Sequence, residues 1–204
     1  MTIMSDIWIK EQCVNKELPM IEPYFPESIG KTDGIKHPSY GQSSYGYDIR
    51  LGRKFKLMST QNATVIVSDI FHETPIIDTR SGVPEECWED IEADSIVIPP
   101  SGCVLGYSLE HIRTPRDVEI ICMAKSSIAR VFLQACVTPI ESGWSGHVTI
   151  EMHNPTPYPI RVHAGDGIMQ MLFFKGDQPC EVSYADRNGK YQNQPAEPVP
   201  SRML

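Results

Sequence analysis

The sequence predicts a mainly β fold with a few short helices, and three observations support this. Seventeen of the 204 residues are proline, and they recur from Pro19 to Pro200, so long helices would be interrupted. Several short apolar or alternating runs lie between turn signals rich in Gly, Pro, Ser and Asp. Strands at this spacing are typical of a sandwich, a jelly roll or a barrel.

The expected elements can be placed along the chain. One ordinary helix is expected over residues 5–14, capped by Ser5 or Asp6. Strands are expected over residues 95–99, 103–108, 118–124, 147–153, 158–163 and 167–174. Residues 43–50 are typical of a turn that enters a strand. The length predicts a single domain over residues 1–204, and the polar segment 185–204 is expected to be a mobile C-terminal tail.

Composition excludes several classes of protein. The net charge of −8 makes the chain a poor nucleic-acid binder. There is no run of 18 apolar residues, and the first residues lack the basic and apolar regions of a secretory signal. The six cysteines form no C-x-x-C pair, which favours free thiols in a reducing compartment. We therefore expect a cytoplasmic protein with no membrane or nucleic-acid partner.

The histidines do not predict a zinc site. His147 and His153 share a face of one predicted strand, but the residues between them span about 20 Å. That distance is too long for two ligands of one metal ion. The zinc-deaminase signature, H-x-E followed by P-C-x-x-C, is absent. No metal ligands are therefore expected.

The segment 125–130, Lys-Ser-Ser-Ile-Ala-Arg, follows an apolar strand directly. Its two serines stand at a strand-to-helix junction, where serine is a favourable N-cap. A helix N-terminus also binds phosphate through its free N–H groups, and Lys125 and Arg130 would add positive charge. A phosphate cradle is one hypothesis. The alternative is an ordinary capped turn, and spacing alone favours the capped turn over the phosphate cradle.

Two carboxylates have alternative interpretations. Glu151 lies on the less apolar face of the predicted strand 147–153, where a glutamate is usually solvated. Inside a barrel or at a subunit interface its pKa could rise, and it could act as a general base or acid. Asp48 is expected to be a structural aspartate that bonds backbone amides.

Four segments, in the same order and spacing, resemble the motifs of the dCTP deaminase family. Residues 124–130 (AKSSIAR) resemble G-[RK]-S-[ST]-x-A-R, and residues 143–151 (GWSGHVTIE) resemble G-W-x-G-x-x-x-L-E. Residues 44–50 (SYGYDIR) resemble S-Y-x-x-D-[IVL]-R, and residues 183–187 and 189–194 resemble the family's tail. The resemblance extends from about residue 20 to 202. Ala124 replaces the usual glycine, and Val131-Phe132 replaces the commoner Cys-Gly or Leu-Gly.

The resemblance implies a fold, an assembly and an activity. The family belongs to the dUTPase-like superfamily, which implies a distorted β-barrel or jelly roll and a homotrimer. It implies hydrolytic deamination of dCTP to dUTP and ammonia without zinc. Mg²⁺ would be carried by the nucleotide triphosphate, and dTTP would be a candidate inhibitor.

The resemblance also assigns site residues. Glu151 would be the general base and acid, with Ser126 and Arg130 as the other catalytic residues. The nucleotide would be bound by Lys125, Ser126, Ser127, Ile128, Ala129, Arg130, Glu141, Thr149, Ile150, Gln170, Tyr184, Lys190 and Gln194.

Three other functions are weighed against the deaminase. One is a bifunctional dCTP deaminase and dUTP diphosphatase, giving dUMP and pyrophosphate, and its overlapping motifs leave it open. Another is a dUTPase, but ordinary dUTPases close the site with a glycine-rich tail, whereas this tail has only Gly189. The last is a non-catalytic nucleotide-binding domain, against which the intact Glu151, Ser126 and Arg130 argue.

Overall fold

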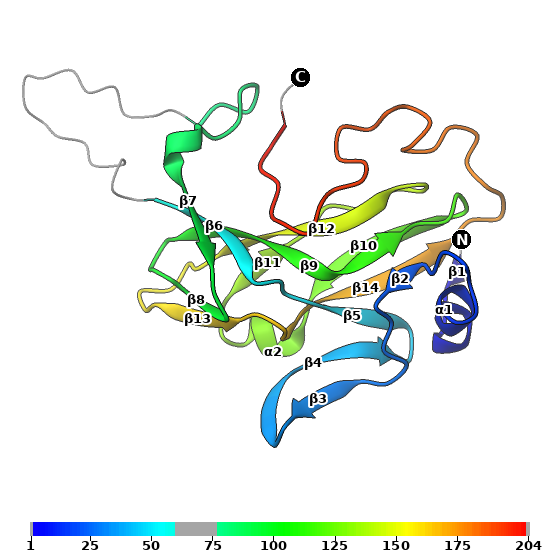
Figure 1. The fold of residues 1–204 in the computed structure, drawn as a ribbon, viewed down its shortest axis with the longest axis horizontal. Helices are drawn as coiled ribbons and strands as arrows, with labels where there is room; N and C mark the ends of the chain where they lie inside the picture. Colours follow the sequence, from blue (N-terminus) through cyan, green and yellow to red (C-terminus); the bar gives the residue numbers. More distant parts are fainter. Residues whose placement is uncertain (1, 60–76, 203–204) are drawn as a thin grey trace, which may run out of the picture.

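The computed structural model describes residues 2–59 and 77–202, and these form a mainly β architecture, as predicted (Figure 1). The strands are β1 (Thr2–Ile3), β2 (Ile21–Glu22), β3 (Ile29–Thr32), β4 (Ile35–Ser43), β5 (Gly46–Arg50), β6 (Lys54–Met58), β7 (Trp88–Glu92), β8 (Ser95–Ile98), β9 (Cys103–Arg113), β10 (Val118–Ala124), β11 (Gln134–Cys136), β12 (Ser145–His153), β13 (Ile160–His163) and β14 (Gly167–Lys175). The helices are α1 (Asp6–Cys13), α2 (Ser126–Ala129) and the 3₁₀ turn η2 (Glu85–Cys87). None of the helices in the described ranges is long and apolar enough to cross a membrane.

The strands form two large sheets and one small one. The first sheet has the order β1-β14-β5-β4-β3, with β10 paired to β14. The second has the order β11-β12-β9-β6-β7, with β2 paired to β9. Strands β8 and β13 form a separate antiparallel pair.

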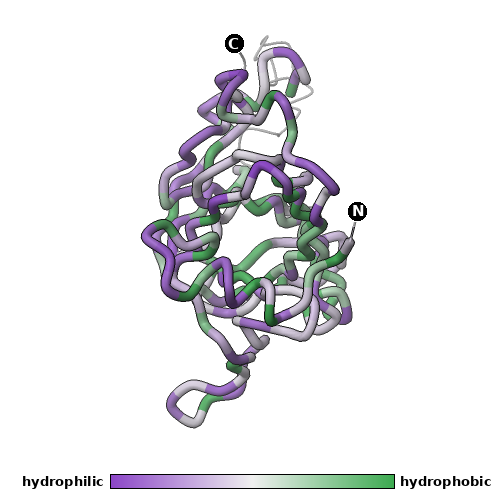
Figure 2. Tube along the Cα trace, turned by 90° about the vertical axis from the view of Figure 1, so that its right-hand side faces the viewer, coloured by the Kyte–Doolittle hydropathy of each residue, from purple (hydrophilic) through white to green (hydrophobic). Residues whose placement is uncertain are grey.

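Two short bridges join the large sheets into a distorted barrel. Leu51, just after β5, bridges to Ser108 of β9, and Ile120 of β10 bridges to Ile140 before β12. Each bridge connects a strand of the first sheet to the chain of the second. The Cα trace accordingly surrounds a central axis when it is viewed from the side (Figure 2).

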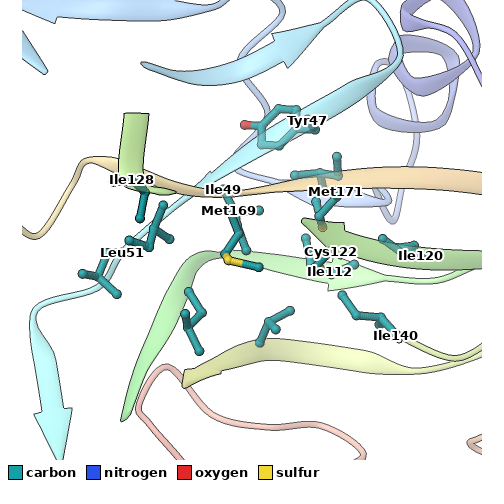
Figure 3. Packing of buried hydrophobic residues seen from close by; sticks show 14 of the residues in the cluster. Tyr47, Ile49, Leu51, Ile112, Ile120, Cys122, Ile128, Ile140, Met169 and Met171 are labelled. Atoms are coloured by element: carbon teal, nitrogen blue, oxygen red, sulfur yellow. The ribbon is translucent and has the colours of Figure 1, made fainter. Parts of the chain in front are cut away.

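The core fills the inside of this barrel. Alternate residues of β12, namely Val148, Ile150 and Met152, are buried, as the strand periodicity predicts. They meet inward side chains of the other strands, including Ile49 and Met169 (Figure 3). Full burial of each such side chain stabilises the fold by about 1.5–3 kcal/mol.

The predicted elements are present, with shifted ends. The predicted helix 5–14 is α1, with Ser5 at the N-cap but without a side-chain capping hydrogen bond. All six predicted strands form, and β9 extends past the predicted end at Ser108 to Arg113. The extension contains the charged residue Glu110, which the sequence pattern alone does not place inside a strand.

Glu110 is fully buried because Arg50 reaches it from the other sheet. The Arg50 Nε atom donates to Glu110 Oε1 at 2.7 Å, and the Arg50 backbone N–H donates to Oε2 at 2.8 Å. The Arg50 guanidinium lies 4.6 Å from the ring centroid of Phe25 and 4.9 Å from that of Tyr40. One ion pair therefore links β5, β9 and the base of the hairpin β3–β4.

Replacing Arg50 by methionine should strongly destabilise the protein. The Glu110 carboxylate would stay buried without its partner, which costs about 3–5 kcal/mol of the free energy of unfolding. Chemical denaturation would measure the change. The matched control is Arg53→Met, because the Arg53–Asp94 pair is exposed and its loss should cost less than about 1 kcal/mol. Equal effects of the two substitutions would contradict a structural role for the buried pair.

Candidate active site

The site residues suggested by the sequence line two separate cavities. The first, of about 750 Å³, lies against β12 and the C-terminal segment. The second, of about 800 Å³, lies between the hairpin β3–β4 and the start of α2. Among the described lining residues the two cavities share none. The first is lined by Glu141, Thr149, Glu151, Tyr184, Lys190 and Gln194, and the second by Lys125, Ser126, Ser127 and Gln170.

Glu151 projects from β12 into the first cavity. Its neighbours along the strand, Ile150 and Met152, point into the core, so the alternation turns Glu151 outward. Across the ladder it is paired with Leu105 of β9 and Cys136 of β11. Desolvation by this partly apolar wall raises the pKa of the Glu151 carboxyl, and a hydrogen bond from its own backbone offsets part of the rise. Glu151 is still exposed to solvent, so its carboxyl group combines a raised pKa with access to a ligand.

Glu141 is held by an ion pair that the sequence did not predict. Its carboxylate pairs with the guanidinium of Arg187, which also lies 5.3 Å from the ring centroid of Tyr184. All three residues line the first cavity. Arg187 lies within the family-like tail segment 183–187. Its place in that segment is the sequence signal that could have marked it as a cavity residue.

The C-terminal segment, residues 185–202, runs back over β12 and forms one wall of the first cavity (Figure 1). The Trp144 indole N–H donates to the Tyr191 carbonyl at 2.7 Å. The backbone of Asn193 donates to Ser145, and His147 donates to the carbonyl of Gln194. The tail thus continues the second sheet beside the first half of β12.

Thr149 and Gln194 bind each other across this junction. The Thr149 hydroxyl donates to Gln194 Oε1 at 3.3 Å and accepts from the Val199 backbone N–H at 3.1 Å. Both residues therefore hold the tail against β12. The side chain of Ile150 is fully buried in the core, so only its backbone atoms are available to a ligand.

The second cavity is built around an ion pair between Lys125 and Asp48. The Lys125 ammonium pairs with the Asp48 carboxylate and lies 3.4 Å from the Ser39 hydroxyl. Burial raises the pKa of Asp48, and Lys125 partly offsets the rise. Asp48 was predicted to bond backbone amides, but its partner is this lysine. β5 and β10 both pair with β14, and Lys125, just after β10, reaches across β14 to Asp48. Gln170 completes the wall and donates to the Ser43 hydroxyl at 3.2 Å.

The serines of the motif are not N-caps, which corrects the sequence interpretation. Lys125 occupies the N-cap position of α2, and Ser126 and Ser127 are its first two helical residues. The chain turns one residue earlier than predicted, so both serines are exposed at the second cavity. Ile128 is buried in the core and Ala129 is exposed, and neither lines a cavity in the described part of the chain.

Arg130 forms no ion pair with Glu151 in the described part of one chain, and it lines neither cavity. It ends α2, is exposed, and makes no ion pair with a carboxylate among the described residues. Phe132, two residues on, has φ of +62° and is 70% exposed. Left-handed backbone disfavours a bulky side chain, which accounts for the glycine more common there in the family that the sequence resembles.

No cluster that could hold a metal ion is formed by three or more His, Cys, Asp or Glu side chains in residues 2–59 and 77–202. His111 and His147 face each other across β9 and β12 with ring centroids 5.3 Å apart. Desolvation lowers the pKa of His111. A third ligand is absent from this pair in the described part of the chain.

Comparison with known proteins identifies the family. The dCTP deaminase-like family profile matches residues 3–176. Proteins named dCTP deaminase from Acidobacterium capsulatum and Halorhodospira halophila are each 43% identical, over 95% and 98% of this chain and 96% and 99% of theirs. One from Dechloromonas aromatica is 44% identical over 98% of this chain and 99% of its own. The chain therefore belongs to the dCTP deaminase-like family.

A solved structure agrees in fold. The crystal structure of 2'-deoxycytidine 5'-triphosphate deaminase from Agrobacterium tumefaciens matches with a TM-score of 0.54 and 18% identity. The match covers 85% of this chain and 46% of that chain.

Gly146 controls the contact between the tail and β12. Its φ is +145°, and a Cβ atom there would lie 2.6 Å from the Gln194 backbone nitrogen. Gly146→Ala should therefore loosen the tail. We expect trypsin to cleave after Arg187 and Lys190 about tenfold faster, the factor that corresponds to ~1.4 kcal/mol, as measured by mass spectrometry.

The control for this test is Gly165→Ala. Gly165 also has a positive φ, of +86°, but a Cβ atom there meets nothing within 4 Å. Cleavage of the tail should stay at the wild-type rate in this variant. Equal acceleration in both variants would show that backbone strain, and not the contact with Gln194, is responsible.

Proposed function

We propose that the protein hydrolyses dCTP to dUTP and ammonia, with Glu151 as the general base and acid. Membership of the dCTP deaminase-like family supports the reaction, since the full-length relatives carry this name. The observation that carries the mechanism is the position of Glu151, a carboxylate of raised pKa on the wall of a cavity large enough for a nucleotide.

The chemistry requires a base because neutral water is a weak nucleophile toward C4 of cytosine. Glu151 takes a proton from the water as its oxygen bonds to C4, and passes the proton to N3. Glu151 then takes the proton of the C4 hydroxyl group and delivers it to the amino group, which leaves as ammonia while the C4 carbonyl forms. The raised pKa suits both steps, because general acid–base catalysis is most efficient when the pKa approaches the working pH.

The reacting water would be held by groups on the same wall. Thr138 lines the first cavity together with Glu151, so backbone carbonyls near Thr138 are suitable acceptors. Ser126 and Arg130 would complete this arrangement, the first by binding the water and the second by orienting Glu151. Within one chain, Ser126 lines only the second cavity and Arg130 lines neither.

The separation of these groups supports a composite site. The first cavity of one chain would bind the base and the sugar, and the second cavity of a neighbouring chain would bind the triphosphate. We therefore propose a homotrimer in which each site is shared between two chains, since closed rings of identical subunits repeat one such interface. Glu141 would contact the sugar, and Lys125, Ser126 and Ser127 the phosphates.

The tail and the metal ion complete the proposal. The tail, residues 185–202, would open to admit the nucleotide and close over it through Lys190 and Gln194. Mg²⁺ would enter bound to the triphosphate as part of the substrate. The hydrolysis is proposed to need no zinc, as the resemblance to the family implies.

Glu151→Gln should abolish most of the activity without harming the fold. The amide keeps the size of the side chain but cannot accept the proton of the water. We expect turnover of dCTP to fall by about 10²–10⁴-fold, with unchanged or increased thermal stability. In the wild type, kcat/KM should fall on acidification at a pH above the usual glutamate pKa of about 4.3, because protonation removes the base. The residual kcat/KM of Glu151→Gln should not show this fall at acidic pH.

The comparison variant is Glu141→Gln on the same scaffold. It lies in the same cavity but is assigned to the sugar, so KM should rise more than kcat falls. Analysis of ammonia, pyrophosphate, dUTP and dUMP after incubation with dCTP would also test the bifunctional alternative. A near-normal kcat in Glu151→Gln would remove the proposed mechanism.

The composite site predicts complementation between two inactive variants. Co-expressed Glu151→Gln and Ser126→Ala chains would assemble at random, and about one quarter of sites would pair an intact Glu151 with an intact Ser126 from another chain. Deaminase activity should therefore return to roughly a quarter of wild type. Sedimentation would check the trimer. Each variant expressed alone should stay inactive. If the co-expressed variants are also inactive, Glu151 and Ser126 must act from the same chain.

A further inference from the structure

The hairpin β3–β4, residues 29–43 and hereafter the arm, forms a wall of the second cavity. It projects from the barrel below α2 (Figure 1). Four consecutive residues of β4, Lys36 to Ser39, line the cavity opposite Lys125, Ser126 and Ser127. The motif segment and the arm therefore enclose the same space.

The lysine of the motif adds little net charge to this cavity. Lys125 is paired with Asp48, and the side chains are only 11% and 7% exposed, so the pair is close to neutral as a unit. A triphosphate carries several negative charges even with Mg²⁺ bound, and its binding needs a surplus of positive charge. A second cation must therefore supply it.

Lys36 is the other lysine among the described residues that line the second cavity. It is exposed at the cavity and forms no ion pair within the described residues. Its cross-strand partner is Lys31, and like charges placed directly opposite destabilise a hairpin. Asp33, in the turn between them, forms no ion pair with either lysine in the described part of the chain. Lys36 thus brings a positive charge to the cavity that is not paired with a carboxylate in the described part of the chain.

The base of the arm is fixed to the barrel, so Lys36 is carried by a positioned wall. The His37 ring stacks on Tyr40 at 5.6 Å, and Tyr40 in turn lies beside the Arg50 guanidinium. A Cβ atom on Gly167 would lie 1.8 Å from the Ser39 carbonyl oxygen, so only glycine lets β14 approach the arm this closely. These contacts hold the cavity wall at a set distance from Lys125.

We propose that the arm is a polyphosphate-binding element in which Lys36 supplies the net positive charge for the triphosphate. The inference rests on the proposed function for the identity of the nucleotide. It adds a residue outside the family-like motifs to the binding machinery. The arm would also bind inorganic tripolyphosphate, which has the same chain of three phosphates but no nucleoside.

The test compares Lys36→Ala with Lys10→Ala, a matched loss of one exposed lysine on α1. Calorimetry with Mg²⁺ and inorganic tripolyphosphate should show about tenfold weaker binding to Lys36→Ala and unchanged binding to Lys10→Ala. The KM for dCTP should rise by a similar factor in Lys36→Ala, with kcat unchanged. Lys36→Arg should retain wild-type binding, because it keeps the charge.

The outcomes separate this proposal from the proposed function. If wild type deaminates dCTP and Lys36→Ala matches Lys10→Ala in both measurements, the arm is not a binding element. Failure of wild type to bind tripolyphosphate would also overturn the proposal. If wild type binds tripolyphosphate through Lys36 but does not deaminate dCTP, the arm is a binding element as proposed, and the proposed deaminase activity is wrong.

Discussion

The ion pair inside the barrel is the constraint on which the rest of the structure depends. Glu110 is a charged residue in the interior, and its burial is tolerable only because Arg50 crosses from the other sheet to meet it. The strand that carries Arg50 also carries Asp48 two residues earlier, on the same face. Closing the barrel therefore also sets the place of the carboxylate that holds Lys125. Through Tyr40, the same arginine steadies the base of the arm.

Desolvation acts on the two cavities in different ways. In the first, Glu151 has no cationic partner among the described side chains, so its desolvation makes it more basic. In the second, Asp48 is also desolvated, but its carboxylate is held by Lys125. Glu151 is therefore left able to take a proton, whereas Asp48 positions the Lys125 ammonium group. The difference follows from the neighbouring groups, because Lys125, just after β10, pairs with Asp48, whereas no described cation pairs with Glu151.

Local sequence pattern was enough to predict the fold class, the helix α1 and the outward direction of Glu151. These depend on alternation and turn residues, which are local properties. The arm was not predicted because β4 contains Pro38 and Gly41, and proline is confined to edge or irregular positions in sheets. The ladder indeed shifts register between Ile29 and Lys31 to accommodate this segment.

The motifs contain many of the residues that line the two cavities, but they did not predict how these residues are grouped. Lys125 and Glu151 are both in family-like segments, yet they line different cavities because β10 and β12 belong to different sheets. Pairing of sheets is a long-range property that the spacing of motifs does not encode. Arg187 and Lys36 were missed for the same reason, since their roles arise from the loop or strand that faces them.

The tail has a consequence for the sheet beneath it. One edge of β12 is covered by β11 only at its far end, and near its start the backbone groups are paired with Asn193 and Gln194. If the tail lifts to open the cavity, it uncovers these main-chain donors and acceptors. An uncovered strand edge is a template for pairing with another chain. Opening of the cavity in the proposed way would thus carry a risk of intermolecular association, and a nucleotide that kept the tail closed would also protect the protein from aggregation.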